Sequence, residues 1–415
     1  MRWLMYGTYS TNFLHAHSNV HTTRMILVPI IGGALIACLW YVIRARTQLV
    51  SVESATEGTK LPFIGTMADA LTQLIAVGAG FSIGREGAPR QMAAACIDVL
   101  GKLKAQVPLF KDLDDPDRRR MIISCGAAAA LASVYGAPWA GIPFALTTLY
   151  GAWTVAGVIA SGAICWIAAE VAWSVVGHKP VLYIGSYNIS DFPRLGWVLL
   201  VIPLAPILAW GFSWLMDQAR GRSNNSIVVA NPGQVLGRYR KLEESKILGM
   251  TLVGVITALV GIVLPQSLGN GSATLYYDVD KPDVAMSAGL GISVALLIIK
   301  PLLTAISLRS GMAGGLLMPS ASTGAAFGST IFFLLAMGGL VPTHVGVFIV
   351  FCAAGAGVIL GITNKSMAFA ILCVIEITGM PYSWAAVLVG VGVLTWAWNY
   401  VFTHWVLHRF AQNAQ

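Results

Sequence analysis

A single glutamate stands between glycines in the sequence Gly84-Arg85-Glu86-Gly87, directly before the apolar run 88–103. Glycines let the backbone approach a ligand closely, and the first turn of a following helix leaves amide N–H groups without partners. Such amides, at the positive end of the helix dipole, make a site for an anion. Two hypotheses follow for Glu86. Its carboxylate either caps these amides or pairs with Arg85, or it competes with a mobile anion for the same position.

A second Gly-rich segment, residues 309–324 (RSGMAGGLLMPSASTG), has the same character in the second half of the chain. We interpret both segments as openings of helices that begin partway across a membrane, as in many transporters. Gly324 and Gly328 form a GxxxG spacing, which favours close packing between helices.

Six further ionisable residues lie in or beside apolar runs, and they are Asp69, Asp98, Glu170, Lys300, Lys365 and Glu376. An ionisable residue at the centre of a membrane span costs about 2.5–3.5 kcal/mol on insertion scales. For Asp98, Lys300, Lys365 and Glu376 we favour a structural role, because a segment end or a neighbouring group could satisfy each of them.

Signals for other chemistries are weaker. Residues 80–84 (GFSIG) fit the GxSxG pattern, in which Ser82 would be the nucleophile of a membrane-embedded serine hydrolase. That motif requires a preceding strand and His and acidic partners, and none is evident. The chain has no HExxH, and its six cysteines lie in apolar stretches without a CxxC spacing. We therefore expect no metal and no cofactor.

Composition restricts the protein class further. Of the 415 residues, 56% are apolar and 11% are charged, whereas soluble proteins carry about 25% charged residues. So few charges cannot cover a water-soluble globule, which argues against a soluble enzyme or a disordered chain. The net charge of +8 comes from basic residues spread over polar loops, so we expect lipid headgroups rather than nucleic acid as its counter-charge.

The elements that must position these residues are apolar segments long enough to cross, or partly cross, a membrane. Twelve are predicted: 25–43, 61–83, 88–103, 121–152, 155–176, 197–216, 247–264, 284–306, 314–337, 345–362, 367–377 and 384–406. The main polar breaks are predicted at 104–120, 178–194 and 218–246. A split near the middle gives a first helical half, 1–195, and a second, 196–415. We predict an all-α polytopic membrane protein.

With these motifs the chain resembles the CLC chloride channels and proton-coupled chloride transporters from about Arg24 to Phe410. Residues 84–87 are similar to the family's GREGP, and residues 310–319 are similar to its GSGxxGGxFxP. Residues 126–141 (GAAAALASVYGAPWAG), 265–271 (PQSLGNG) and 353–378 give further support in the family's order. The resemblance implies two inverted-topology halves whose broken helices meet at a central anion site.

The resemblance also implies roles for single residues. Glu86 would be the gate, and the backbone amides of Leu316 and Leu317 would bind the anion. The family's central serine falls near Thr47, and a central tyrosine is matched to Tyr400 only across a deletion. The implied anion-binding set is Thr47, Gly84, Arg85, Gly87, Gly315, Leu316, Leu317 and Tyr400. Arg85 is expected to anchor the loop more than to contact the anion. Ala88 stands where the family has proline.

The main departure is at Thr147 and Thr148, where exchangers of the family have two acidic residues. Thr148 takes the position of the internal proton-transfer glutamate, and a threonine hydroxyl does not titrate near neutral pH. A channel-like or weakly proton-coupled chloride pathway is therefore predicted. A chloride/proton antiporter and a fluoride exporter of the same fold remain alternatives.

The resemblance further implies a homodimer in the plasma (inner) membrane of a prokaryote, of the type without a cytoplasmic regulatory domain. Small anions, membrane lipid and, under the antiporter alternative, protons are the expected partners. Only 24 residues precede the first apolar run at Met25, fewer than in the family, so the N-terminus is expected to be shortened.

Overall fold

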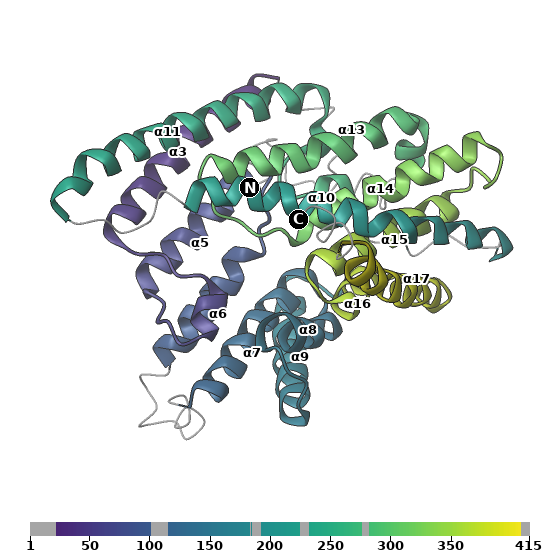
Figure 1. Ribbon diagram of the computed structural model, residues 1–415, viewed down its shortest axis with the longest axis horizontal. Helices are drawn as coiled ribbons and strands as arrows, with labels where there is room; N and C mark the ends of the chain where they lie inside the picture. Colours follow the sequence, from purple (N-terminus) through teal and green to yellow (C-terminus); the bar gives the residue numbers. More distant parts are fainter. Residues whose placement is uncertain are drawn as a thin grey trace.

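A computed structural model describes residues 22–100, 115–182, 184, 192–224, 232–275 and 282–407, and these are almost entirely helical (Figure 1). Within the described residues there is no β-strand, only one isolated backbone bridge. In the part of the chain that the structure describes, eight helices are long and apolar enough to cross a membrane. The prediction of an all-α polytopic membrane protein is confirmed.

The first part of the chain contains short and long helices in alternation. In order these are α3 Thr22–Arg46, α4 Val52–Thr56, α5 Phe63–Gly78, α6 Gly87–Leu100, α7 Pro116–Tyr135, α8 Pro138–Pro143, the π-helix η3 Phe144–Tyr150 and α9 Val155–Val176. Because α5 has 16 residues and α6 has 14, neither is long enough to cross a bilayer alone. The segment with Gly84 joins the end of α5 to the start of α6 inside the molecule.

The remaining elements follow the 3-10 helix η4 Phe192–Leu200. They are α10 Val201–Asn224, α11 Pro232–Val263, η5 Pro265–Ser267, α12 Ser272–Leu275, α13 Pro282–Arg309, α14 Leu317–Met337, α15 Val345–Thr363, α16 Met367–Thr378, α17 Tyr382–Val401 and η7 Phe402–Leu407. In Figure 1, α11 runs beside α3, and α13, α14 and α15 form a packed group next to α16 and α17.

Two predicted boundaries were wrong. The apolar run 121–152 is three elements, α7, α8 and η3, because Gly136 ends α7 in the left-handed region at φ 60°. The predicted polar break at 218–246 is largely helical, since α10 continues to Asn224 and α11 begins at Pro232. A polar sequence signals the end of the lipid-facing span, but it does not require the helix to stop there.

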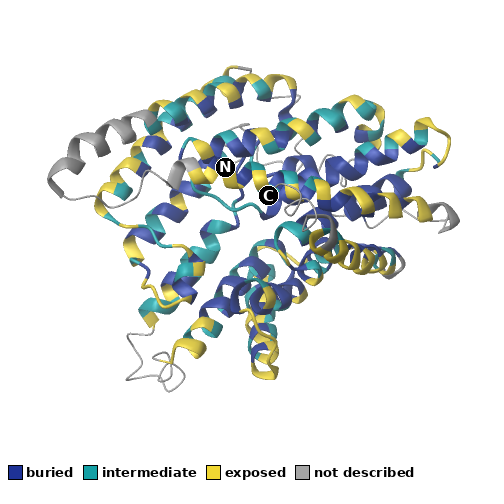
Figure 2. Cartoon of the chain, in the orientation of Figure 1, coloured by how far each residue is buried: buried dark blue, intermediate teal, exposed yellow. Residues whose placement is uncertain are grey.

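Among the eight candidate spans of the described residues, α15 is the most buried, with 89% of its apolar window buried, compared with 22% in α9 (Figure 2). It packs on α14, and the GxxxG prediction is confirmed at this contact. A Cβ atom on Gly324 or Gly355 would overlap the backbone of the other helix. These two glycines therefore allow the α14 and α15 backbones to touch.

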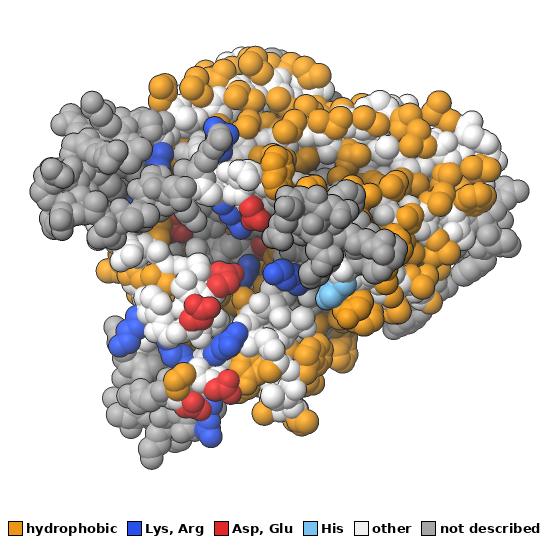
Figure 3. Space-filling view, viewed as in Figure 1, with side chains coloured by type: hydrophobic (Ala, Val, Ile, Leu, Met, Phe, Trp, Pro, Cys, Tyr) orange, Lys and Arg blue, Asp and Glu red, His pale blue; other side chains and the backbone are white. Residues whose placement is uncertain are grey.

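Side chains on the outside are sorted by type. On the face drawn in Figure 3, charged side chains gather over α5, α6 and α7, whereas apolar side chains dominate the side formed by α13, α14 and α15. Large apolar residues such as Ile31, Leu252 and Val263 are exposed on α3 and α11. An exposed apolar belt of this kind is expected where lipid is the solvent.

Candidate functional site

The two Gly-rich segments meet inside the molecule. The Gly84 N–H donates to the Gly315 carbonyl at 2.8 Å, and the Gly315 N–H donates back to the Gly84 carbonyl at 3.0 Å. This antiparallel bridge joins the loop between α5 and α6 to the loop between α13 and α14. The interrupted helices of the two halves therefore point their ends at one place.

Glu86 is completely buried at this meeting point. Its Oε1 atom accepts a hydrogen bond from the Met318 N–H at 3.4 Å, and its Oε2 atom accepts one from the Tyr135 hydroxyl at 3.4 Å. The Leu317 amide also interacts with this carboxyl group. The carboxylate thus occupies the N-terminus of α14, where free amides and the helix dipole favour negative charge.

The α14 amides that interact with the Glu86 carboxylate come from the second half of the chain. The sequence suggested the first turn of α6, which follows Glu86 directly, but the Met318 bond lies on α14. The alternative pairing with Arg85 is also absent, since no ion pair joins Glu86 to Arg85 in the described structure. The Arg85 guanidinium instead lies 5.8 Å from the centre of the Tyr135 ring.

Glycine is required at both bridge positions because the Glu86 carboxylate lies against them. A Cβ atom added to Gly84 or Gly315 would overlap the Glu86 side chain, and that side chain supplies the three nearest atoms in each case. At Gly87 a Cβ atom would lie 2.8 Å from Gln73 Oε1 and 3.3 Å from the Gly315 nitrogen. All three glycines therefore bring backbone close to the carboxylate or to the bridge that holds it.

A buried lysine supports the segment before Glu86. Lys300 of α13 donates from Nζ to the carbonyls of Ser267 at 2.9 Å and Gly269 at 2.6 Å. The Gly269 N–H in turn donates to the Gly80 carbonyl at 2.9 Å. One turn after Lys300, the Thr304 hydroxyl pairs with that of Ser82 at 2.8 Å. The predicted structural role of Lys300 agrees with these contacts.

Three other acidic residues in or beside apolar runs also have structural partners. Asp98 accepts from the Leu61 N–H and pairs with Arg119, and Glu376 accepts from the Trp139 and Ala140 amides at the start of α8. Asp69, buried on α5, accepts from the Trp40 indole and from Gln73. Lys365 is exposed in the turn after α15.

Two cations lie near Glu86, and neither forms an ion pair with it among the described residues. Arg90 of α6 exerts an electrostatic effect on Glu86 while it pairs with Glu53 of α4 at 3.0 Å. Partial desolvation raises the pKa of Glu53, but the Arg90 charge and local hydrogen bonds outweigh it and hold that pKa below its ordinary value. Arg220 of α10 donates to the Gly314 carbonyl at 3.5 Å.

Three residues matched by the resemblance lie elsewhere. Tyr400 of α17 is 58% exposed and stacks on His404, and Thr47 lies after α3 against Gly65 of α5. Neither has a contact with Glu86 in the described structure. Thr148 lies in η3 with a buried hydroxyl that has no hydrogen-bond partner. Leu316 precedes α14 and Leu317 begins it, so both lie at the carboxylate's end of that helix.

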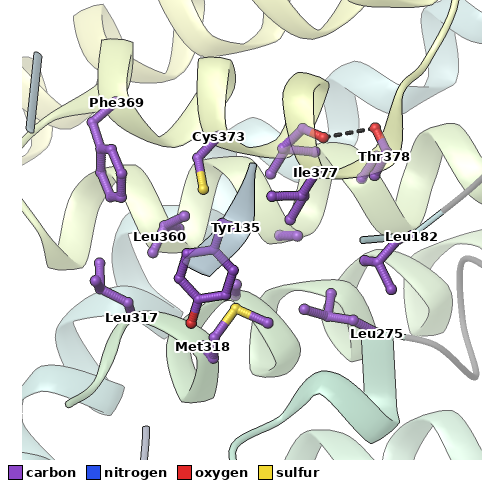
Figure 4. Close-up of a pocket in the computed structure, with 14 residues that line it drawn as sticks. Tyr135, Leu182, Leu275, Leu317, Met318, Leu360, Phe369, Cys373, Ile377 and Thr378 are labelled. Carbon is purple, nitrogen blue, oxygen red and sulfur yellow. Dashed lines mark hydrogen bonds between the residues drawn. The ribbon is translucent and has the colours of Figure 1, made fainter. Parts of the chain in front are cut away.

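Tyr135 was missed at the sequence level. It ends α7 and is 2% exposed, and it lies within the stretch 126–141 that supports the family resemblance. A tyrosine directly before the helix-terminating Gly136 was the available signal. Its ring borders a small apolar cavity of about 20 Å³ that Leu317, Met318 and Cys373 also line (Figure 4).

The structure gives no support to hydrolase chemistry at Ser82. Its hydroxyl is buried and paired with Thr304, and the segment before it is the helix α5 rather than a strand. Among the described residues, no group of three or more His, Cys, Asp or Glu side chains is placed to hold a metal ion.

Interrupted helices, a buried carboxylate at a helix N-terminus and an apolar outer belt define a polytopic membrane protein with broken helices that meet inside it. A family model described as voltage gated chloride channel matches residues 32–397. The chain belongs to this CLC family and is an integral membrane protein.

Relatives cover most of the chain. A ClcB-like chloride channel protein of Ralstonia nicotianae is 26% identical over 85% of this chain and 77% of its own length. The voltage-gated ClC-type chloride channel ClcB of Shigella flexneri is 23% identical over 91% of this chain and 85% of its own. The H⁺/Cl⁻ exchange transporter ClcA of Vibrio parahaemolyticus is 29% identical over 74% of this chain and 61% of its own.

Solved structures share the fold. A slow cyanobacterial Cl⁻/H⁺ antiporter aligns with a TM-score of 0.71 at 17% identity, covering 94% of this chain and 86% of its own. A CLC-type fluoride/proton antiporter aligns with a TM-score of 0.58 at 16% identity, covering 93% and 96% respectively.

Proposed function

We propose that this protein transports chloride across the inner membrane of a prokaryote through a pathway gated by Glu86, in a channel-like or weakly proton-coupled manner. The observation that carries the proposal is the position of the Glu86 carboxylate, which fills the N-terminus of α14. A site that stabilises a carboxylate there can stabilise a small inorganic anion in its place. Relatives named as chloride channels and exchangers support chloride as that anion.

The gate works by competition between two anions. Ionised Glu86 occupies the amides of α14 and excludes chloride. Protonation removes its negative charge, so the neutral side chain leaves and chloride takes the amides. Neutral N–H and O–H donors offset the dehydration of chloride without holding it as tightly as a full positive charge would. Flux is therefore expected to rise as the pH falls.

Replacement of the gate tests this mechanism. Glu86→Gln in reconstituted liposomes should give chloride flux that is high and independent of pH, because the amide cannot ionise. Wild-type protein prepared in the same way should lose flux as the pH rises. Flux in the variant that still falls with rising pH would reject Glu86 as the gate.

Two alternatives of the same fold concern the transported ions. Thr148 offers no titratable proton carrier, which favours weak coupling, whereas the exchanger relatives favour a chloride/proton antiporter. Simultaneous measurement of chloride flux and proton flux decides between them, because only an antiporter lets a chloride gradient drive protons uphill. Competition by fluoride in the same assay tests the fluoride-exporter alternative.

We also propose a homodimer with one pathway in each subunit, on the basis of the family resemblance. The mass of the detergent-solubilised protein by light scattering tests it, and a monomeric mass would argue against it.

A further inference from the structure

The gate carboxylate has one side-chain partner of unassigned role, Tyr135. Within the described residues, the Tyr135 hydroxyl is the only side-chain group that donates a hydrogen bond to Glu86. Backbone N–H groups of Met318 and Leu317, both from the second half of the chain, also interact with this carboxylate. The Tyr135 hydroxyl and the Met318 N–H therefore reach the two carboxylate oxygens from opposite halves of the chain.

The Tyr135 hydroxyl is held in place by its surroundings. The ring is 2% exposed at the end of α7, and the Arg85 guanidinium lies 5.8 Å from its centre. Leu317, Met318 and Cys373 surround it on the side of the apolar cavity (Figure 4). These neighbours leave Glu86 as the acceptor that the structure records for this hydroxyl.

Departure of the carboxylate leaves both donors in need of another acceptor. A buried O–H or N–H without a partner is unfavourable, so the vacated position favours an anion that accepts both hydrogen bonds. We propose that the Tyr135 hydroxyl is a direct ligand of the transported anion and alternates between that anion and Glu86. This inference rests on the proposed gating function and identifies α7 as the source of the hydroxyl ligand.

The donor spacing also bears on anion size. Both donors lie 3.4 Å from the carboxylate oxygens, which is longer than the usual 2.5–3.0 Å for O–H···O or 2.7–3.2 Å for N–H···O bonds. A chloride ion is larger than an oxygen atom and fills such a gap better.

Chloride binding to detergent-purified protein, measured by calorimetry, tests this assignment. In a Glu86→Ala background the internal competitor is absent, so both donors are open to added chloride. Adding Tyr135→Phe removes the hydroxyl and keeps the ring, and it should weaken chloride binding about 3- to 10-fold. Adding Tyr150→Phe is the matched control, because Tyr150 is also buried but donates to Asp117, and it should leave chloride binding unchanged.

A second measurement is independent of the amount of correctly folded protein. Hydrogen bonds are stronger to compact chloride than to thiocyanate, whose charge is spread over three atoms. Tyr135→Phe should therefore lower the ratio of chloride to thiocyanate affinity measured on one sample. If Glu86→Ala alone binds chloride, and adding Tyr135→Phe changes neither the chloride affinity nor the ratio of chloride to thiocyanate affinity, the assignment of Tyr135 is overturned. No chloride binding by Glu86→Ala alone would overturn the proposed function and this inference together.

Discussion

Glu86 can occupy the N-terminus of α14 only because two glycines, distant from each other in the sequence, leave space for its side chain. Gly84 and Gly315 pair through their backbones, and both would collide with the Glu86 carboxylate if they carried a Cβ atom. The absence of side chains at the bridge therefore makes room for the Glu86 carboxylate. The position of the Glu86 charge therefore depends on the space that these two glycines leave.

A coupling between Gly315 and Glu86 follows from this contact. Gly315→Ala should lower the free energy of unfolding by about 1–3 kcal/mol, because the added methyl group crowds the carboxylate. In a Glu86→Ala background most of that loss should disappear, because the colliding side chain is gone. Gly314→Ala serves as the control, since its Cβ atom would lie 2.7 Å from the Ile83 side chain whatever occupies position 86. Equal losses from Gly315→Ala in both backgrounds would contradict the proposed contact.

Short helices of the first half are held by groups from the second half. α8 has only six residues, and its first amides donate to Glu376 of α16, from Trp139 at 3.0 Å and from Ala140 at 2.8 Å. A segment of this length is not stable by itself, so external capping matters more than intrinsic helix propensity. The same contact fixes the start of η3, which carries Thr148.

Removal of this cap is expected to destabilise the protein. Glu376→Leu deprives two amides of their acceptors and should cost about 1–2 kcal/mol, seen as a lower midpoint of thermal unfolding in detergent. Glu170→Leu on α9 removes an exposed carboxylate and should leave the midpoint nearly unchanged. Similar midpoints for the two variants would rule out the capping role.

Across the whole molecule, apolar side chains are exposed on the outer helices, where lipid is the solvent. α15 is enclosed by protein, whereas α11 exposes Leu252 and Val263. In a soluble protein so much exposed apolar surface would be an aggregation hazard, but in a bilayer it faces lipid of similar polarity. Polar backbone at the broken helices is tolerated because it lies inside the protein, away from lipid.

A photoactivatable hydrophobic probe dissolved in the bilayer can verify this arrangement. We expect it to label α11, at positions such as Leu252 and Leu259, and to leave α15 unlabelled, because 89% of the apolar window of α15 is buried. Mass spectrometry of peptides from the labelled protein would report both helices in one sample. Labelling of α15 as strong as that of α11 would contradict the packing.

The sequence alone determined the class of protein and the two Gly-rich segments that meet around Glu86. Low charge content required lipid surroundings, and glycines around Glu86 and before Leu316 marked the two helix openings, since both signals are local. The tertiary structure decided which groups meet: Glu86 binds amides of α14 rather than α6, Tyr135 donates to Glu86 whereas Tyr400 has no contact with it in the described structure, and Lys300 holds carbonyls distant from it in the sequence. These contacts join residues from separate helices, so their positions depend on how all the helices pack, which no local pattern of residues specifies.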